Sequence, residues 1–203
     1  MLPSRTDDPS LSRIRAGITK SVLSYRSSLT AAERRVVEQR LPPPWIEEIE
    51  RRFNTSYIPS AEHVKLLDVL VDVVGPVRLR RYFAEVYLAE VSKLPLLRTL
   101  IEATLRPFGA SPGRLAKVMP RAWQVLAKDT GRFEARVDLK AGTGRLEYSH
   151  LAPELSSSGS WVCTFAGVFD GFLEQCGARG VVEMADVDVS CGRATYVLGW
   201  DAG

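Results

Sequence analysis

The chain is poor in the two residue types that most often build metal sites and covalent frameworks. Among 203 residues it has three cysteines and two histidines. Cys163, Cys176 and Cys191 form an odd set with no close pair, which argues against a disulfide framework and against the short Cys and His spacings that zinc prefers. The sequence therefore predicts no metal site and a reducing, cytoplasmic location.

The chain also lacks a strong charge of one sign and a long apolar run. Its formal net charge is +3, and glutamates lie close to each arginine cluster, so solvated helix faces are favoured over a nucleic-acid surface. Charges break the strongly apolar runs well short of a membrane-spanning length, and we expect no integral membrane segment. The amphipathic segment 78–108 could lie on acidic lipid, but a core helix with a solvated face is the preferred interpretation.

The usual patterns of catalysis are missing as well. No G-x-S-x-G elbow surrounds a serine, and "AGTGR" is followed by no helix and so is not a phosphate loop. Asp186 and Asp188 share one face of a predicted strand, which is typical of a solvated surface. An enzyme would need His63 or His150 within about 3 Å of a carboxylate or thiol partner. We expect no enzymatic activity.

What is present begins with a long helical region. After a polar lead over 1–10 that we expect to be disordered, apolar residues recur at helical spacing as far as residue 131. The predicted helices cover 11–29, 30–41, 45–53, 60–74, 77–94, 96–109 and 111–131. Thr30 and Glu33 are spaced as a capping box, Ser60 is a candidate cap, and Pro120 is expected to bend or split the last helix.

The periodicity changes to strict alternation at residue 132. "RFEARVDLK" and "RLEYSH" flank a glycine-containing turn and predict a hairpin; "GVVEMADVDV" and "RATYVLGW" predict a second one after a helix at 161–176. Segregated helices and hairpins predict an α+β fold, in which an N-terminal helical layer packs on a four-stranded antiparallel sheet of ββαββ order. We expect a single domain over 11–203, with a helical part 11–131 and a ββαββ part 132–203.

The helix at 161–176 carries the candidate site residues. At about 100° per residue its large apolar side chains and one thiol share a quarter of the helical wheel. With one strand tyrosine, they are the candidates for a ligand pocket, although a plain core is expected first: Tyr148, Trp161, Phe165, Phe169, Phe172 and Cys176. Cys163, Gly167 and Gly171 form a separate stripe of small residues. Such a stripe permits close packing, either within the domain or across a dimer.

This order of elements resembles a known group of folds. Helices, the hairpin "RFEARVDLKAGTGRLEYSH", the helix "SWVCTFAGVFDGFLEQCGA" and the hairpin "GVVEMADVDVSCGRATYVLGW" look like haem-nitric-oxide-binding domains, 4-vinyl-reductase-type domains and Bet-type subunits of the TRAPP complex. Within this group, "GITKSVLSYR", "YIPSAEHVKLLDVL" and the "A-x-Y-x-x-x-W" ending resemble a myxobacterial paralogous family of uncharacterised function. The resemblance covers roughly residues 14–200.

The resemblance implies specific residues for a cofactor, and the chain departs from them. Haem-nitric-oxide-binding domains carry an iron-ligating helix histidine and a Tyr-x-Ser-x-Arg motif. Here serine directly follows Tyr148, and no arginine follows that serine at the motif position. His63 lies in an early helix rather than at the expected position. The 4-vinyl-reductase type often has a cysteine pair near its final hairpin, where this chain has Cys191 alone. We therefore expect no cofactor.

Two functions remain open from the sequence. The leading expectation is a non-enzymatic binding or interaction module, a scaffold or signalling adaptor with a protein partner or a homodimer. The alternative is a sensor of a small apolar molecule or acyl chain, with a pocket between the helices and the sheet.

Overall fold

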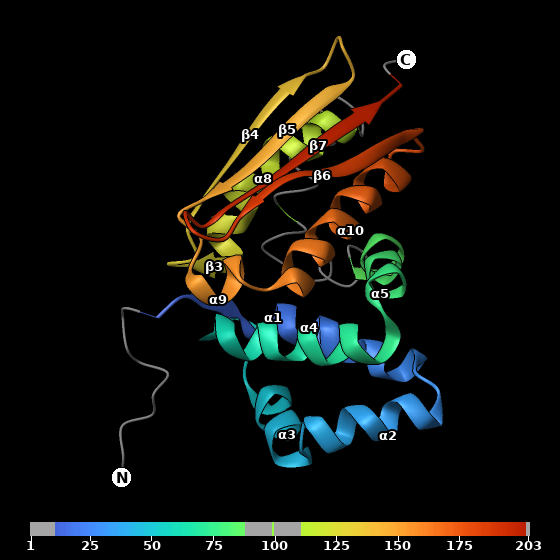
Figure 1. Ribbon diagram of the computed structural model, residues 1–203, viewed down its shortest axis with the longest axis vertical. Coiled ribbons are helices and arrows are strands. Elements are labelled where there is room, and N and C mark those ends of the chain that lie inside the picture. The colour runs from blue at the N-terminus through green and yellow to red at the C-terminus, as the bar shows by residue number, and fades with distance from the viewer. Residues whose placement is uncertain (1–10, 88–98, 100–110, 202–203) are drawn as a thin grey trace.

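The computed structural model describes residues 11–87, 99 and 111–201, and its C-terminal strands form a four-stranded antiparallel sheet. The sheet has the order β4-β5-β7-β6 (Figure 1). The strands are β4 (Arg132–Asp138), β5 (Thr143–Ser149), β6 (Gly180–Asp188) and β7 (Arg193–Trp200). The expected α+β class and the ββαββ order are therefore confirmed.

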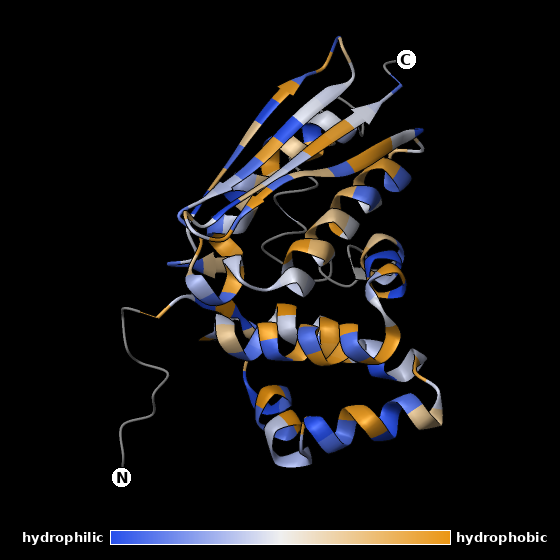
Figure 2. Ribbon diagram, viewed as in Figure 1, coloured by the Kyte–Doolittle hydropathy of each residue, from blue (hydrophilic) through white to orange (hydrophobic). Residues whose placement is uncertain are grey.

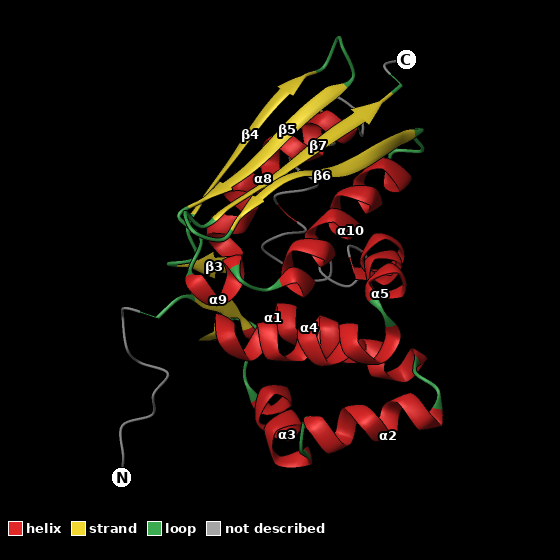
Figure 3. Ribbon diagram, in the orientation of Figure 1, coloured by secondary structure: helices red, strands yellow, loops and turns green. Residues whose placement is uncertain are grey.

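Two helices, α8 (Pro112–Leu126) and α10 (Gly159–Gln175), lie against one face of this sheet (Figure 3). The alternation of the strands produces that face, because every second side chain points toward the helices. Figure 2 shows the resulting mixture of hydrophobic and hydrophilic residues along each strand. The approach of α8 depends on Gly113, where an added Cβ would lie 2.5 Å from Leu139 Cδ2 and 2.8 Å from the Trp200 ring.

The N-terminal helices lie on the side of α10 away from the sheet, with α2 and α3 farthest from it (Figure 1). They are α1 (Ala16–Leu23), α2 (Ala31–Arg40), α3 (Pro43–Arg51), α4 (Ser60–Val74) and α5 (Pro76–Tyr82). A π-helical turn, Phe83–Tyr87, follows α5. The predicted capping box is confirmed, since Thr30 Oγ1 accepts from the Glu33 amide and Glu33 accepts from the Thr30 amide. Between α2 and the sheet, α4 contacts α1, α5 and α10.

A second, small sheet was not predicted. Its order is β2-β1-β3, with β1 (Arg13–Arg15), β2 (Tyr57–Pro59) and β3 (Ala127–Lys128). Consequently the helices expected over 11–29 and 111–131 were too long. Strands of two or three residues are too short to show an alternating period, and their pairing depends on residues far apart in the chain.

Three local expectations also need correction. Ser60 is the first residue of α4 rather than its cap, since Pro59 occupies the cap position and the Ser60 hydroxyl bonds to Glu154. Pro120 lies inside α8 without splitting it. The loop before α10 contains a short helix, α9 (Pro153–Ser156).

Two expectations fall outside what the structure describes. These are the disordered lead over 1–10 and, within the helices predicted over 77–94 and 96–109, residues 88–94 and all of 96–109 except residue 99. Within the described residues, no helix is both long enough and apolar enough to cross a bilayer.

Candidate functional site

Aromatic side chains from both layers meet in one cluster between the sheet and its helices. Phe133 of β4 and Tyr148 of β5 are cross-strand neighbours, and their rings stack with centroids 4.0 Å apart. The Tyr148 ring meets Trp161 at 5.1 Å and Phe165 at 5.2 Å, both edge-on. Trp123 of α8 closes the group, 5.0 Å from Phe165. Edge-on and stacked rings at these distances stabilise a cluster beyond simple burial.

The cluster continues along α10 toward β7. Phe169 lies 5.1 Å from Tyr196 and 5.7 Å from Phe172, measured between ring centroids. Five of the six predicted pocket residues therefore belong to one connected group. Cys176 is the exception, since it caps the C-terminal end of α10 and is only half-buried.

The polar atoms within this cluster differ in whether they have a hydrogen-bond partner. Trp123 donates its Nε1 hydrogen to Thr130 Oγ1 at 3.1 Å, and the Tyr196 hydroxyl donates to the Val162 carbonyl at 3.0 Å. Burial raises the pKa of Tyr196 well above its usual range. Trp161 is different: its side chain is 0% exposed, and its Nε1 has no acceptor in the described part of the chain. Most buried donors in proteins are paired, so this exception needs an explanation.

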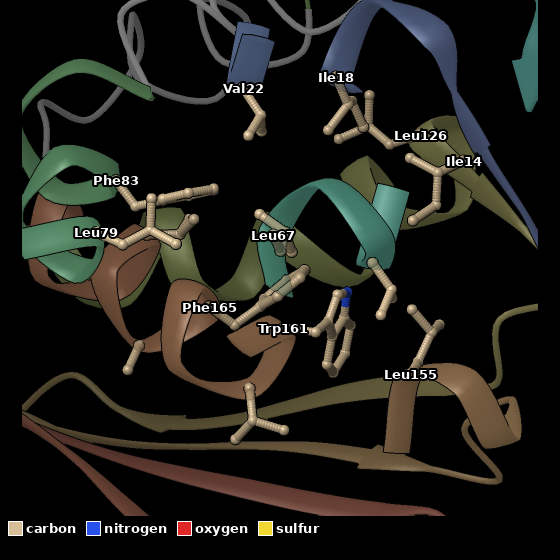
Figure 4. Packing of buried hydrophobic residues seen from close by; sticks show 14 of the residues in the cluster. Ile14, Ile18, Val22, Leu67, Leu79, Phe83, Leu126, Leu155, Trp161 and Phe165 are labelled. Atoms are coloured by element: carbon tan, nitrogen blue, oxygen red, sulfur yellow. The ribbon is translucent and has the colours of Figure 1, made fainter. Parts of the chain in front are cut away.

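The Trp161 nitrogen points away from the strands and toward α4 (Figure 4). The labelled side chains around this region come from β1, α1, α4, α5, α8, α9, α10 and the π-helical turn, and all except Trp161 are hydrocarbon: Ile14, Ile18, Val22, Leu67, Leu79, Phe83, Leu126, Leu155 and Phe165. We refer to these nine side chains and Trp161 as the interlayer wall. They are all buried, and they come from elements between β1 and α10.

One buried histidine lies in the helical part. His63 of α4 is 4% exposed, and its Nδ1 lies 3.0 Å from Thr19 Oγ1 of α1. Burial without a carboxylate partner lowers its pKa to about 4. The imidazole is therefore neutral near pH 7 and joins α1 to α4.

The stripe of small residues on α10 faces α5. An added Cβ on Gly167 would lie 2.3 Å from the Arg80 carbonyl oxygen and 2.9 Å from Phe83 Cβ. Cys163, one turn earlier, lies with its Sγ 3.6 Å from the Pro76 carbonyl oxygen, and burial raises the pKa of its thiol. Gly171 is buried on the same helix. The neighbour of Gly167 and Cys163 thus belongs to the same chain.

Arg80 joins three elements beside this stripe. Its guanidinium donates to both carboxylate oxygens of Asp170 on α10, at 2.6 and 2.9 Å, and to the Val182 carbonyl of β6 at 2.9 Å. The hydrogen bond to Asp170 is the main reason that the pKa of Arg80 is raised. A bidentate pair of this kind fixes the orientation of both helices.

Polar groups collect at the opposite end of α10. Ser12 and Ser60 donate to Glu154, while Ser158 and Ser160 donate to Asp68 of α4. Burial raises the pKa of Glu154, but the two serine hydrogen bonds outweigh this effect, so its pKa lies below the usual value.

An open cleft of about 550 Å³ lies at this polar end of α10. Arg40, Lys65, Asp68 and Glu154 line it together with apolar residues of α4 and with residues 157–159 at the start of α10. Charges of both signs stand side by side there, so the cleft favours neither an anion nor a cation. The carboxylates of Asp68 and Glu154 already accept hydrogen bonds from serine hydroxyls of the same chain.

The sequence reasoning missed three members of the aromatic cluster. Phe133 and Tyr196 lie on the buried faces of β4 and β7, and the alternating patterns of those strands could have identified them. Trp123 lies on the apolar side of α8. Each was visible as an inward residue, but the sequence alone did not show that the three faces meet.

No protein-family model and no curated protein matches the chain. Solved structures, by contrast, share its fold. An Fe(II) H-NOX protein from K. algicida has a TM-score of 0.63 at 11% identity, covering 93% of this chain and 97% of its own. An oxygen-binding H-NOX domain related to soluble guanylate cyclases gives 0.59 at 14% identity, covering 91% and 92%. An H-NOX protein from S. oneidensis in the Fe(II)NO state gives 0.59 at 9%, covering 91% and 98%.

These structures confirm the expected relationship of fold to haem-nitric-oxide-binding domains, and at such low identity they show the fold alone. They also contradict our leading expectation of a scaffold or adaptor module. Two of these structures are named for the small molecule that the protein binds, oxygen in one and nitric oxide in the other, rather than for an assembly.

Neither histidine of this chain is placed to ligate a haem iron. Haem iron needs an axial ligand such as histidine, cysteine or tyrosine. The chain has only two histidines: His63 is held by Thr19, and His150 lies exposed in a left-handed turn after β5. Within the described ranges no group of three or more His, Cys, Asp or Glu residues could hold a metal ion.

Proposed function

We propose that this chain is a sensor domain that binds a small apolar molecule between its N-terminal helices and α10, the helix that lies on the sheet, without haem and without catalysis. The observation that carries the proposal is the Trp161 indole N–H. It is completely buried, has no acceptor among the residues that the structure describes, and belongs to a wall of hydrocarbon side chains. An unpaired buried donor costs roughly 1–3 kcal/mol, and a ligand with an acceptor atom would remove that cost.

The fold supports the same function. Structures of this shape are described as binding oxygen or nitric oxide. In this chain neither histidine is placed to ligate iron, whereas the interlayer wall unites elements from β1 to α10. A molecule held there would touch α4, α8 and α10 together, so its arrival would change how the helical layer packs on the sheet layer. This coupling is what a sensor requires.

Thermal unfolding of the purified full chain tests the proposal. A ligand present at 100 times its Kd stabilises a protein by about 2.7 kcal/mol, and for a chain of this size each kcal/mol raises Tm by about 2–4 °C. We expect small neutral aromatic compounds such as 1-indanone to raise Tm in a saturable manner. Haemin should give no stoichiometric complex with a shifted Soret band.

A matched pair of variants locates the effect. Leu67→Phe enlarges a side chain of the interlayer wall, and Leu66→Phe enlarges an equally buried neighbour that points about 100° away around α4. Both changes overpack the core by a similar amount. The proposal is supported if the Tm increase is lost in L67F and kept in L66F. If neutral aromatic compounds leave Tm of the wild-type chain unchanged up to their solubility, the proposal is wrong.

A further inference from the structure

We infer that the ligand is an uncharged molecule that carries a hydrogen-bond acceptor, and that Trp161 is the residue that selects for it. This inference rests on the proposed function and gives the chemical class of the ligand at that site. It depends on how Trp161 is held, on the groups that surround it and on the single hydrogen bond that it can offer.

The position of Trp161 is fixed by contacts that leave its nitrogen free. Its backbone amide donates to the Ser158 hydroxyl at 3.1 Å, and its carbonyl accepts from the Thr164 hydroxyl at 2.8 Å. Its ring is held by Phe165 at 4.5 Å and by Tyr148 at 5.1 Å, between centroids. Because these contacts determine the direction of the ring, the indole cannot turn to find an acceptor elsewhere.

Two polar groups near Trp161 are already engaged. The Ser158 hydroxyl is also within hydrogen-bond distance of Asp68, at 3.1 Å. The neighbouring indole, Trp123, lies 6.2 Å away between centroids. It cannot accept a hydrogen bond from Trp161, because an indole N–H is only a donor, and it already donates to Thr130. Ser158 and Trp123 are thus engaged elsewhere in the fold, and the Trp161 N–H is directed toward the other side chains of the interlayer wall.

The charge of the ligand follows from the charges of the chain. Arg80 and Asp170 neutralise each other, and Glu154 is engaged by Ser12 and Ser60. The imidazole of His63 stays neutral because of its burial. The labelled side chains around the Trp161 nitrogen carry no charge. An ion placed among them would lose its hydration without gaining a partner, which costs several kcal/mol. The ligand is therefore neutral.

The acceptor follows from the chemistry of indole. Its Nε1–H is a donor only, so the matching group is a carbonyl, an ether or a ring nitrogen. A pure hydrocarbon of the same size would fill the same volume and leave the N–H unpaired. The site should therefore prefer the molecule with the acceptor, and the preference should depend on this one atom.

Two probes of nearly equal size, 1-indanone and indane, test the inference on the full chain. They differ by a carbonyl oxygen. We expect 1-indanone to bind roughly tenfold more tightly, which is the scale of one neutral hydrogen bond. In ¹H–¹⁵N spectra its addition should move one of the four indole N–H signals downfield, whereas indane should not. The moving signal should be the one that disappears in Trp161→Phe.

In Trp161→Phe the tenfold preference should vanish while indane still binds. Trp45→Phe removes an indole of α3, outside the interlayer wall, and keeps the Trp161 N–H; it serves as the control and should retain the preference. If Trp161→Phe does not fold, through-space contacts between the moving N–H and Leu67 identify it in the wild-type chain. Equal binding of the two probes, tighter binding of indane, or a downfield shift of another indole overturns the inference and leaves the proposed function intact. Binding of neither probe overturns the proposed function itself.

Discussion

Replacing Gly167 by alanine should destabilise the chain, although alanine is the better helix former. The added Cβ would lie 2.3 Å from the Arg80 carbonyl oxygen and 2.9 Å from Phe83 Cβ. One of these neighbours is backbone and the other is the first atom of a side chain, so neither can rotate away. Since carbon atoms pack best at about 3.5–4.0 Å, α5 and the turn after it must move away from α10.

The size of the effect is the difference between two terms. Overpacking a well-packed core costs typically about 1–3 kcal/mol, and the upper end applies here because backbone must move. Alanine recovers about 1 kcal/mol relative to glycine inside a helix. We therefore expect a net loss of about 2 kcal/mol in the free energy of unfolding, equivalent to a decrease of about 4–8 °C in Tm.

Urea unfolding followed by far-UV circular dichroism measures this difference directly. Gly159→Ala, at the first position of the same helix, is the matched control because an added Cβ there meets no atom within 4 Å. This variant should be as stable as the wild type or slightly more stable. If Gly167→Ala matched its control, the described packing of α5 on α10 would be refuted.

Two further predictions concern charged and titratable groups. Arg80→Met should lower the free energy of unfolding by about 2 kcal/mol because it leaves Asp170 and the Val182 carbonyl without their shared donor. Hydrogen exchange of the β6 amides should become faster in this variant. Arg81→Met, a change at an exposed arginine, is the control and should have little effect on either measurement. For His63, the folded-state pKa of about 4 lies below the usual 6.5, so the unfolded chain binds more protons between these values. The free energy of unfolding should fall by roughly 3 kcal/mol as the pH decreases from 6.5 to 4, and His63→Gln should flatten that decrease in urea titrations; an unchanged slope would contradict the neutral, buried imidazole.

Local patterns in the sequence were sufficient for the main elements. Strict alternation identified β4 and β5, because a half-buried strand must place every second side chain in the core. The spacing of Thr30 and Glu33 identified the start of α2, because a capping box is satisfied within four residues. Helical geometry also grouped Trp161, Phe165 and Phe169 correctly on one face of α10.

Contacts between distant residues could not be predicted in this way. The strands β1, β2 and β3 have two or three residues each, and only their pairing across the chain makes them strands. Arg80 appeared as one member of an arginine cluster, yet its partners lie 90 and 102 positions away in the sequence. The sequence also left open whether Gly167 faces another chain.

The sequence by itself determined which side chains are apolar, which face of each element is buried and that α10 carries an aromatic side. Only the tertiary structure decided which polar atoms those faces leave unpaired. Trp161 appeared among the residues expected first as core, because its ring is large and apolar. Its N–H becomes informative only when Ser158, Tyr148 and Phe165 have fixed the ring and the described ranges offer it no acceptor. Periodicity reports burial, whereas hydrogen-bond satisfaction depends on the three-dimensional positions of donors and acceptors.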